Sequence, residues 1–488
     1  MAGGQGACVI VVDPLSTGGT LAVEIAGRGF AVMAVWSKEL TVEMRTNHVP
    51  AIARDMQYHA EVEERSTILE TARAVRSACL DTELVACIVG CETGITLADA
   101  LSEELGLRTN GAQTNRRNKS VQQQCVKAAG LRAVREASGT EWTQVKSFAE
   151  GEAMPVVVKP VESAGSEGVK LCHSLEETEA HFNLLMGAQR TVGSFGAAVL
   201  VQEYLRGKEY VVDHVSCDGV HKTVMVWVYD KRPCNGANFV YFGTLPVPAD
   251  SEVARTLIEY TCGVLDALGI RNGPSHGEIM MTPDGPCLVE MNCRAHGGDG
   301  TFVPLARALT GGYSQVDATV DSFLDEAAFR RLPDVPPSPF RVSGQEVCLV
   351  SMCGGVVAST AGLESLRELR SFVSLDTGVQ VGSEVTASVD MLTSAGSLIL
   401  FHPDREVIEE DLRTVRRMEA ECALFELRED LSASEAEDPR GELSADASAS
   451  TDADSEGEPA AVAGAPTRSC SHEPACSGGG AAPALCAA

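Results

Sequence analysis

Short apolar runs alternate with helix-like segments near the start of the chain. ACVIVVD at 7–13 has the length and composition of a buried strand, and GGTLAVEIAGRGF at 18–30 has the apolar spacing of a helix. The strand pattern returns in AVMAVWS at 31–37 and in ELVACIVGC at 83–91. Strands and helices that alternate in this way favour a parallel sheet with helices on both faces. We therefore predict an α/β domain with a doubly wound parallel sheet over residues 1–115.

The turn that joins this first strand to its helix, DPLSTGG at 13–19, brings backbone N–H groups to a helix N-terminus. Such a terminus can bind phosphate or carboxylate. The turn lacks the GxGxxG pattern, however, and no acidic residue follows the second strand at ribose-binding distance. A plain tight turn is the favoured interpretation, with anion binding as the alternative, and a nicotinamide-dependent oxidoreductase is disfavoured.

The rest of the chain divides into three regions by composition. Residues 116–335 hold most of the polar motifs. Residues 340–428 contain short strand-like segments punctuated by glycine and end in a charged helix, which predicts a small β-rich domain. Residues 431–488 consist mainly of Ala, Ser, Gly, Pro and acidic residues. We expect this last segment to be disordered, because it cannot bury enough apolar surface to fold.

Composition and charge narrow the function classes. The formal net charge of −29 argues against nucleic-acid binding, because phosphates would be repelled. The 17 cysteines include no CxxC pair, and most lie in apolar segments, which indicates reduced thiols. No apolar run approaches the about 20 residues that cross a bilayer, and Met1–Ala7 lacks the basic segment of a signal peptide. We therefore expect a cytoplasmic protein without membrane segments.

The segment HGEIMMTPDGPCLVEMNCRAHGG, at 276–298, places two carboxylates in strand-like sequence. TPDGP predicts a hairpin with a three-residue loop, in which Thr282 faces Pro286. Counting outward from this loop places Glu278 opposite Glu290. Like charges directly opposite each other destabilise a ladder, so a cation is expected between them.

The residues that follow on the second strand suit a metal bound to a nucleotide. Glu290, Asn292 and Arg294 are spaced by two and therefore share one face of the strand. Proteins hold Mg²⁺ through one or two carboxylates together with nucleotide phosphates. Asn292 would add a neutral oxygen ligand, and the guanidinium of Arg294 can bind two phosphate or carboxylate oxygens at once.

Upstream segments offer a site for phosphates. The strand-like MPVVVK ends in Lys159 and is followed by the small-residue loop 163–168, whose backbone N–H groups could close on phosphate oxygens. Lys119 adds a second cation. The loop is not a Walker motif, because no GKS or GKT follows. Further on, EYL at 203–205 connects two strand patterns and Glu209 lies at the start of the second, so this connector could bind adenine and ribose.

Lys119, the strand 156–159 with its glycine loop, the connector 203–205 and EMNCR at 290–294 resemble the ATP-grasp superfamily in order and spacing. The phrases EYVVDHVS, VWVYDKRPCNGANFVYFG and VEMNCRAHGG are most similar to L-amino-acid ligases of the bacilysin-synthetase type and to carnosine-synthase-like carboxylate–amine ligases. The resemblance covers residues 8–428.

The resemblance implies an ATP-grasp fold with three folded parts. The doubly wound sheet of residues 1–115 would be the Rossmann-like domain that precedes the ATP-grasp domain. Residues 116–335 would form the ATP-grasp domain itself, with two lobes and a hinge near 203–205. Residues 340–428 would form the small β-rich domain that closes over them.

The resemblance also implies a role for each candidate residue. Nucleotide binding would fall to Lys119 and Lys159 on the α- and β-phosphates, to Ser163, Gly165, Ser166 and Gly168 over the triphosphate, to Glu203, Tyr204 and Leu205 on adenine, and to Glu209 on ribose. Metal binding, of two Mg²⁺ or Mn²⁺ ions, would fall to Glu278, Glu290 and Asn292.

The implied catalytic residues are both cationic. Arg294 would stabilise charge on the reacting carboxylate and phosphate. Lys231 would lie in a loop over the γ-phosphate, although Arg232 could take that part and a surface turn is a third interpretation. His276 and His296 are more simply explained as hydrogen-bonded spacers than as substrate contacts.

The function implied is an ATP-dependent carboxylate–amine ligase. The γ-phosphoryl group of ATP would activate a carboxylate as an acyl phosphate, and an amine would displace phosphate to give an amide, ADP and phosphate. Small-molecule substrates, in particular amino acids, are expected as partners, together with a possible homodimer and with no nucleic acid or membrane. The alternatives are an ATP-grasp ligase of another class, such as a purine-pathway or bicarbonate-using enzyme, and an inactive nucleotide-binding regulator.

Overall fold

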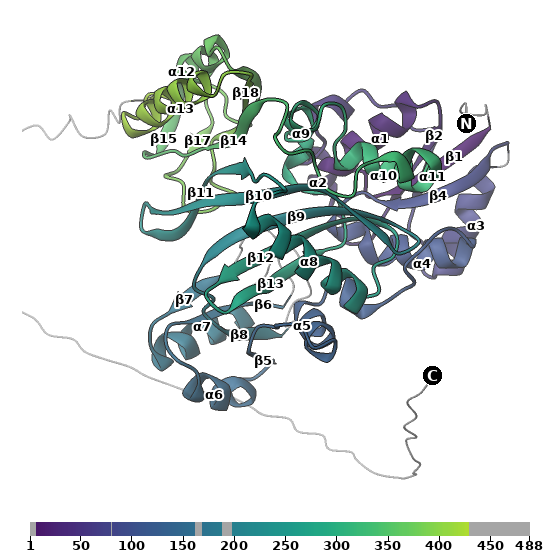
Figure 1. Ribbon diagram of the computed structural model, residues 1–488, viewed down its shortest axis with the longest axis horizontal. Helices are drawn as coiled ribbons and strands as arrows, with labels where there is room; N and C mark the ends of the chain where they lie inside the picture. Colours follow the sequence, from purple (N-terminus) through teal and green to yellow (C-terminus); the bar gives the residue numbers. More distant parts are fainter. Residues whose placement is uncertain (1–5, 80, 162–167, 188–197, 429–488) are drawn as a thin grey trace, which may run out of the picture. The chain divides into compact units, whose positions relative to one another are not determined.

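The N-terminal part of the computed structural model is a parallel sheet with helices on both faces (Figure 1). The structure describes residues 6–79, 81–161, 168–187 and 198–428. The strands are β1 (Ala7–Val12), β2 (Ala31–Trp36), β3 (Ala60–Glu63) and β4 (Glu83–Val89), in the order β3-β2-β1-β4. The helices of this part are α1 (Thr17–Gly27), α2 (Val42–Asn47), α3 (Ile68–Ala78) and α4 (Ile95–Leu105).

Alternation along β1 explains why this sheet is covered twice. Val9 and Val11 pack with α1, whereas Ile10 and Val12 pack with α3 and α4 on the other face. Every residue of the strand core is apolar because both faces are buried, as in other doubly wound sheets. The predicted doubly wound parallel sheet is confirmed.

A small antiparallel sheet follows. Helix α5 (Lys119–Ala128) precedes it, and its strands are β5 (Glu136–Gly139), β6 (Val156–Pro160), β7 (Lys170–Cys172) and β8 (Val199–Glu203), in the order β5-β8-β6-β7. Helices α6 (Trp142–Gly151) and α7 (Leu175–Gly187) share one core with this sheet, so its opposite face is left for other contacts.

The largest element is an eight-stranded antiparallel sheet. In spatial order its strands are β13 (Gly285–Asn292), β12 (Gly273–Thr282), β9 (Lys208–Cys217), β10 (Val220–Cys234), β11 (Ala237–Pro246), β14 (Ser343–Leu349), β18 (Gly396–His402) and β16 (Phe372–Asp376). Helix α8 (Glu252–Ala267) packs on one face. On the other face α9 (Val303–Thr310), α10 (Gln315–Leu324) and α11 (Glu326–Arg331) join α1 in one core.

The C-terminal region does not have a sheet entirely of its own. Strands β14, β16 and β18 belong to residues predicted as a separate domain over 340–428, yet they extend the eight-stranded sheet. The remaining elements are β15 (Gly355–Ser359), α12 (Ala361–Ser365), β17 (Glu384–Val385), α13 (Arg405–Ala420) and β19 (Glu426–Leu427), which pack around a local core. The segment 431–488, predicted to be disordered, lies outside the described residues. None of the described helices is long and apolar enough to span a membrane.

Candidate active site

Most of the residues predicted from the sequence line one cavity. Its two walls come mainly from the small antiparallel sheet β5-β8-β6-β7, called the four-stranded sheet below, and from the eight-stranded sheet. The predicted residues among them are Lys119, Lys159, Glu203, Tyr204, Leu205, Glu209, Lys231, Glu278, Glu290, Asn292 and Arg294. The remaining lining residues, not singled out from the sequence, are Val157, Val169, Gln202, Phe239, Tyr241, Met280 and Val289.

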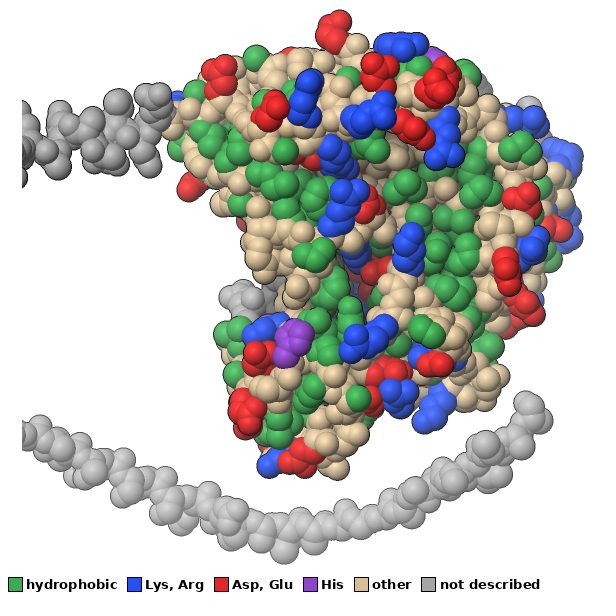
Figure 2. All heavy atoms as spheres, turned by 60° about the vertical axis from the view of Figure 1, so that its left-hand side comes forward, with side chains coloured by type: hydrophobic (Ala, Val, Ile, Leu, Met, Phe, Trp, Pro, Cys, Tyr) green, Lys and Arg blue, Asp and Glu red, His purple; other side chains and the backbone are tan. Residues whose placement is uncertain are grey.

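The cavity therefore combines an apolar portion with clustered charges. Valine, methionine and aromatic side chains would suit the flat face of a base, whereas the lysines and carboxylates would suit phosphates and metal ions. On the molecular face in Figure 2, Lys and Arg side chains alternate with Asp and Glu, so the net acidity of the chain does not gather there into one acidic field.

Glu278 and Glu290 pair directly across β12 and β13, as the sequence predicted. The prediction of the hairpin loop was wrong, because Thr282 pairs with Gly285 and the loop has two residues instead of three. A register shift between Glu278 and Ile279 leaves Val289 as an extra residue, and this bulge restores the pairing of the two glutamates.

Neighbouring residues shift the pKa values of the two glutamates in opposite directions. The ammonium of Lys119 lies 2.7 Å from Oε1 of Glu290. Burial, together with the charges of Glu278 and Glu92, raises the pKa of Glu290 in spite of this lysine. Burial acts in the same direction on Glu278, but hydrogen bonding and charge from His276 outweigh it and lower the pKa of Glu278.

Lys159 is the residue before the last in β6, on the opposite wall, and is buried. Burial lowers the pKa of its ammonium, and the positive charge of Lys119 lowers it further. Among the described residues no carboxylate forms an ion pair with Lys159. A buried ammonium without a paired anion is costly, so this position favours an anionic ligand.

Lys231 lies inside the cavity and not on a surface turn. Its ammonium is 2.7 Å from Oε2 of Glu209 and lies over the rings of Tyr229 and Tyr241, at 5.0 and 4.3 Å from their centroids. Burial opposes the charged form, but Tyr241 and Glu209 raise the pKa of Lys231. Arg232 is exposed and pairs with Asp230, and of these two neighbours it is Lys231 that lines the cavity.

The connector between the two sheets, 203–205, lines the cavity, but the carboxylate of Glu203 is already engaged. Its Oε1 accepts a hydrogen bond of 2.9 Å from the backbone N–H of Arg135, and its Oε2 lies 2.7 Å from the guanidinium of the same residue. None of the hydrogen bonds among the described residues uses the backbone N–H or C=O of Leu205. The backbone of this connector therefore keeps hydrogen-bonding capacity for a base.

The predicted glycine loop falls almost wholly outside the described residues, which exclude Ser163, Gly165 and Ser166. Gly168 is described and has a φ of +73°, a value that favours glycine. Its carbonyl accepts a hydrogen bond of 2.8 Å from the imidazole of His181. Gly168 itself is not among the lining residues, but its neighbour Val169 is.

Arg294 is oriented by a residue that the sequence analysis missed. Its Nε lies 3.3 Å from Oε2 of Glu92, and one NH2 donates to Oδ1 of Asn292 at 3.2 Å. Glu92 follows β4 of the N-terminal sheet. The carboxyl ends of parallel strands are where α/β domains place ligands, and this was the available signal for Glu92.

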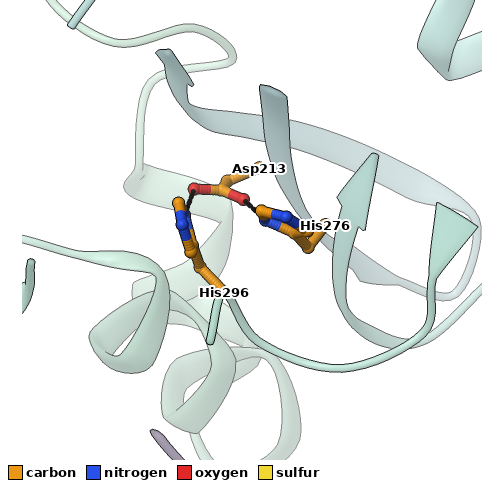
Figure 3. A group of neighbouring side chains, drawn as sticks. All are labelled: Asp213, His276 and His296. Atoms are coloured by element: carbon orange, nitrogen blue, oxygen red, sulfur yellow. Dashed lines mark hydrogen bonds and ion pairs between the residues drawn. The ribbon is translucent and has the colours of Figure 1, made fainter. Parts of the chain in front are cut away.

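His276 and His296 do not line this cavity. Each donates its Nδ1–H to the carboxylate of Asp213, His276 to Oδ1 and His296 to Oδ2, both at 2.9 Å, as Figure 3 shows. This geometry agrees with their interpretation as hydrogen-bonded residues. The turn 13–19 likewise packs tightly, since a Cβ on Gly18 would lie 2.5 Å from the backbone of Gly90.

Known proteins resemble the chain over these same segments. Residues 152–302 match the model of the ATP-grasp domain. Dapdiamide A synthase from Enterobacter agglomerans is 26% identical over 422 residues, which cover 85% of this chain and 96% of that protein. Alanine–anticapsin ligase from Bacillus subtilis is 26% identical over 270 residues, 51% of this chain and 55% of that protein. The solved L-amino acid ligase from Bacillus licheniformis has a TM-score of 0.65 at 16% identity, covering 85% and 97% of the two chains.

Proposed function

From its ATP-grasp fold and domain, we infer that this chain is an ATP-dependent carboxylate–amine ligase that joins amino acids through an acyl phosphate. Its similarity to dapdiamide A synthase and to an alanine–anticapsin ligase supports substrates of the amino-acid type. The observation that carries the proposal is the cavity in which buried Lys119 and Lys159 face the opposed carboxylates of Glu278 and Glu290.

The charged and polar side chains of the cavity fit a nucleoside triphosphate bound together with hard divalent ions. Glu278, Glu290 and Asn292 offer oxygen atoms of the kind that Mg²⁺ and Mn²⁺ bind, and the repulsion between the two glutamates is relieved by a cation. Lys119 and Lys159 are cations whose mutual repulsion is relieved by a polyanion. When bound, the divalent ions would neutralise charge on the transferring phosphoryl group.

The chain's own residues would then position the reactants. Lys231 and Arg294 place positive charge in the cavity, where it would stabilise the negative charge of the reacting carboxylate and phosphate. The backbone of Leu205 and the side chains of Val157 and Met280 would hold the base, so that the γ-phosphate faces the carboxylate. Phosphoryl transfer needs positioning and charge stabilisation more than covalent help from the protein, which this cavity offers.

A screen of amino-acid pairs tests the proposal. The purified chain would be incubated with ATP, Mg²⁺ and mixtures of free amino acids, with phosphate release and product mass as readouts. We expect phosphate release that depends on all three components and a product whose mass equals two amino acids less one water. A protein that neither binds ATP nor releases phosphate with any acid and amine would contradict the proposal.

A further inference from the structure

Asp213 is a buried carboxylate saturated with hydrogen-bond donors. It lies in the middle of β9 and is 1% exposed. Its Oδ1 accepts from Nδ1 of His276 and its Oδ2 from Nδ1 of His296, both at 2.9 Å (Figure 3). Oδ2 also accepts from Nε1 of Trp227, at 2.7 Å. Burial alone would raise the pKa of Asp213, but the two histidines outweigh it, so the carboxylate remains ionised.

The donors explain the cluster without a metal ion. Ligand atoms of Asp213, His276 and His296 lie within 4.8 Å of one another, a spacing that a metal ion could bridge. However, one of the three donors is the N–H of Trp227, which does not deprotonate. Since both carboxylate oxygens already accept N–H groups, hydrogen bonding satisfies this buried charge.

Asp213 fixes the ring of His276 in one orientation. With Nδ1–H donated to Asp213, the other ring nitrogen, Nε2, lies 3.4 Å from Oε1 of Glu278 and 3.3 Å from the hydroxyl of Tyr229. His276 and Glu278 are two residues apart on β12, so their side chains share one face of the sheet. The imidazole therefore stands directly beside one of the two opposed carboxylates.

We propose that Asp213 is a positioning residue for metal binding, acting through His276 on the carboxylate of Glu278. This inference rests on the proposed function, because it assigns Glu278 to the metal. Partners behind the ligands of a metal fix their orientation, and loss of such a partner typically lowers metal affinity by about 10- to 100-fold. His296 and Trp227 hold the far oxygen of Asp213 and so keep the carboxylate aligned with His276.

The variant Asp213→Asn tests this assignment. Asparagine has nearly the same shape but keeps one acceptor oxygen where aspartate has two. The N–H groups of His276, His296 and Trp227 can then no longer all be accepted, so the ring of His276 loses its fixed orientation. The full chain would be titrated with Mn²⁺ in the presence of ADP, and free Mn²⁺ would be measured by electron paramagnetic resonance. The Mg²⁺ concentration for half-maximal phosphate release is the second readout. We expect the dissociation constant of Mn²⁺ and the half-maximal Mg²⁺ concentration each to rise at least about 10-fold. The dissociation constant of ADP without metal should change less than about twofold.

His214→Asn is the matched control. His214 is the next residue of β9, is equally buried and bonds through Nε2 to Thr223, but it faces away from the cavity. We expect this variant to lower the unfolding temperature and to leave the metal dependence unchanged. If Asp213→Asn keeps the wild-type metal dependence, or if His214→Asn shifts it equally, the inference is wrong.

A second variant, His276→Gln, keeps the inference testable if Asp213→Asn does not fold. If Asp213→Asn shows no cooperative unfolding transition, His276→Gln decides, because it removes the same contact to Glu278 and predicts the same shift. An unchanged metal dependence in His276→Gln would overturn the inference while leaving the ligase proposal intact. If the wild type itself binds neither ADP nor Mn²⁺ with ADP, the proposed function fails and this inference fails with it.

Discussion

The two walls of the cavity differ in how their charges are balanced. On the wall formed by the eight-stranded sheet, Glu290 is paired with Lys119 and Glu209 is paired with Lys231. On the wall formed by the four-stranded sheet, Lys159 is buried and has no ion-pair partner among the described residues. On the wall of the eight-stranded sheet, here called the acidic wall, two of the carboxylates are therefore neutralised by lysines of the protein. On the wall of the four-stranded sheet, the cationic wall, the charge of Lys159 needs an anion from outside the protein.

This difference predicts that substitutions on the two walls impair different properties of the protein. Substitutions on the acidic wall should impair metal-dependent chemistry more than nucleotide binding. Substitution of Lys159 should impair nucleotide binding and should relieve an unfavourable burial. Activity and stability measured side by side can therefore separate the two roles.

Glu290→Gln should have the largest effect. The variant keeps the shape of the side chain but removes one of two carboxylates proposed to bind the metal, so we expect phosphate release to fall by about 1000-fold. Both the ion pair with Lys119 and the repulsion from Glu278 disappear, so the thermal unfolding temperature should change little. Steady-state kinetics and thermal unfolding measure the two effects. Full activity in this variant would disprove the metal assignment.

Lys231→Met and Arg232→Met form a neighbouring pair with opposite expectations. Lys231 is half-buried in the cavity beside Glu209. Its loss should lower turnover by about 100-fold, because the charge proposed to face the transferring phosphate disappears. Arg232 is exposed, so its loss should change turnover by less than about twofold. The ratio of the two rates is the measurement. Equal losses would show that the loop acts through its fold and not through the lysine.

Lys159→Met should weaken nucleotide binding but not stability. Loss of a charged contact to phosphate is expected to raise the dissociation constant of ADP by about 10-fold. The unfolding temperature should stay the same or rise, because an unpaired buried ammonium is replaced by an apolar chain of similar length. Calorimetric titration with ADP and thermal unfolding give the two numbers, and Lys170→Met, an exposed lysine on β7, is the control. A destabilised Lys159→Met with normal ADP binding would contradict the account.

The smallest effect is expected outside the cavity, at Asp317. Its carboxylate accepts two hydrogen bonds from Arg307, at 2.9 and 2.7 Å, and caps α10 through Ser314. Burial opposes ionisation, but Arg307 and Ser314 outweigh it and lower the pKa of Asp317. The stabilisation is therefore present above the pKa of an unfolded aspartate, about 4, and is lost as the pH falls through the lower folded value.

We expect Asp317→Asn to cost about 1 kcal/mol at pH 7, since Arg307 is partly exposed and screened. The difference between the variant and the wild type should shrink on acidification, and denaturant unfolding at several pH values measures it. A difference that grows as the pH falls would show that the carboxylate is not ionised in the folded protein.

The pattern of the sequence predicted the site better where the residues lie close together in the chain. Glu278 and Glu290 could be paired because a hairpin turn fixes the register of adjacent strands. The bulge at Val289 could not be foreseen, because it depends on packing, and the pairing survived only because the wrong loop length and the missing bulge cancel. Lys159 was singled out as the last residue of the strand-like MPVVVK, and it lies one residue before the end of β6.

Residues joined only by the tertiary fold were missed. Glu92 reaches Arg294 from the N-terminal sheet, and Asp213 bonds with His276 and His296 from a different strand. Nothing in the local sequence marks such contacts, since their chemistry appears only when distant segments meet. The extension of the eight-stranded sheet by residues 343–402 was missed for the same reason, because strand order is not written in a local pattern.

Isotope transfer tests the central claim most directly. Amino acids carrying ¹⁸O in their carboxyl groups would be supplied with ATP and Mg²⁺, and the released phosphate and nucleotides would be analysed by mass spectrometry. An acyl phosphate requires that one labelled oxygen of the acid leaves with phosphate when the amine attacks, so we predict one ¹⁸O in each phosphate released. Turnover that places the label in AMP, or that releases unlabelled phosphate while an amide forms, would contradict the mechanism.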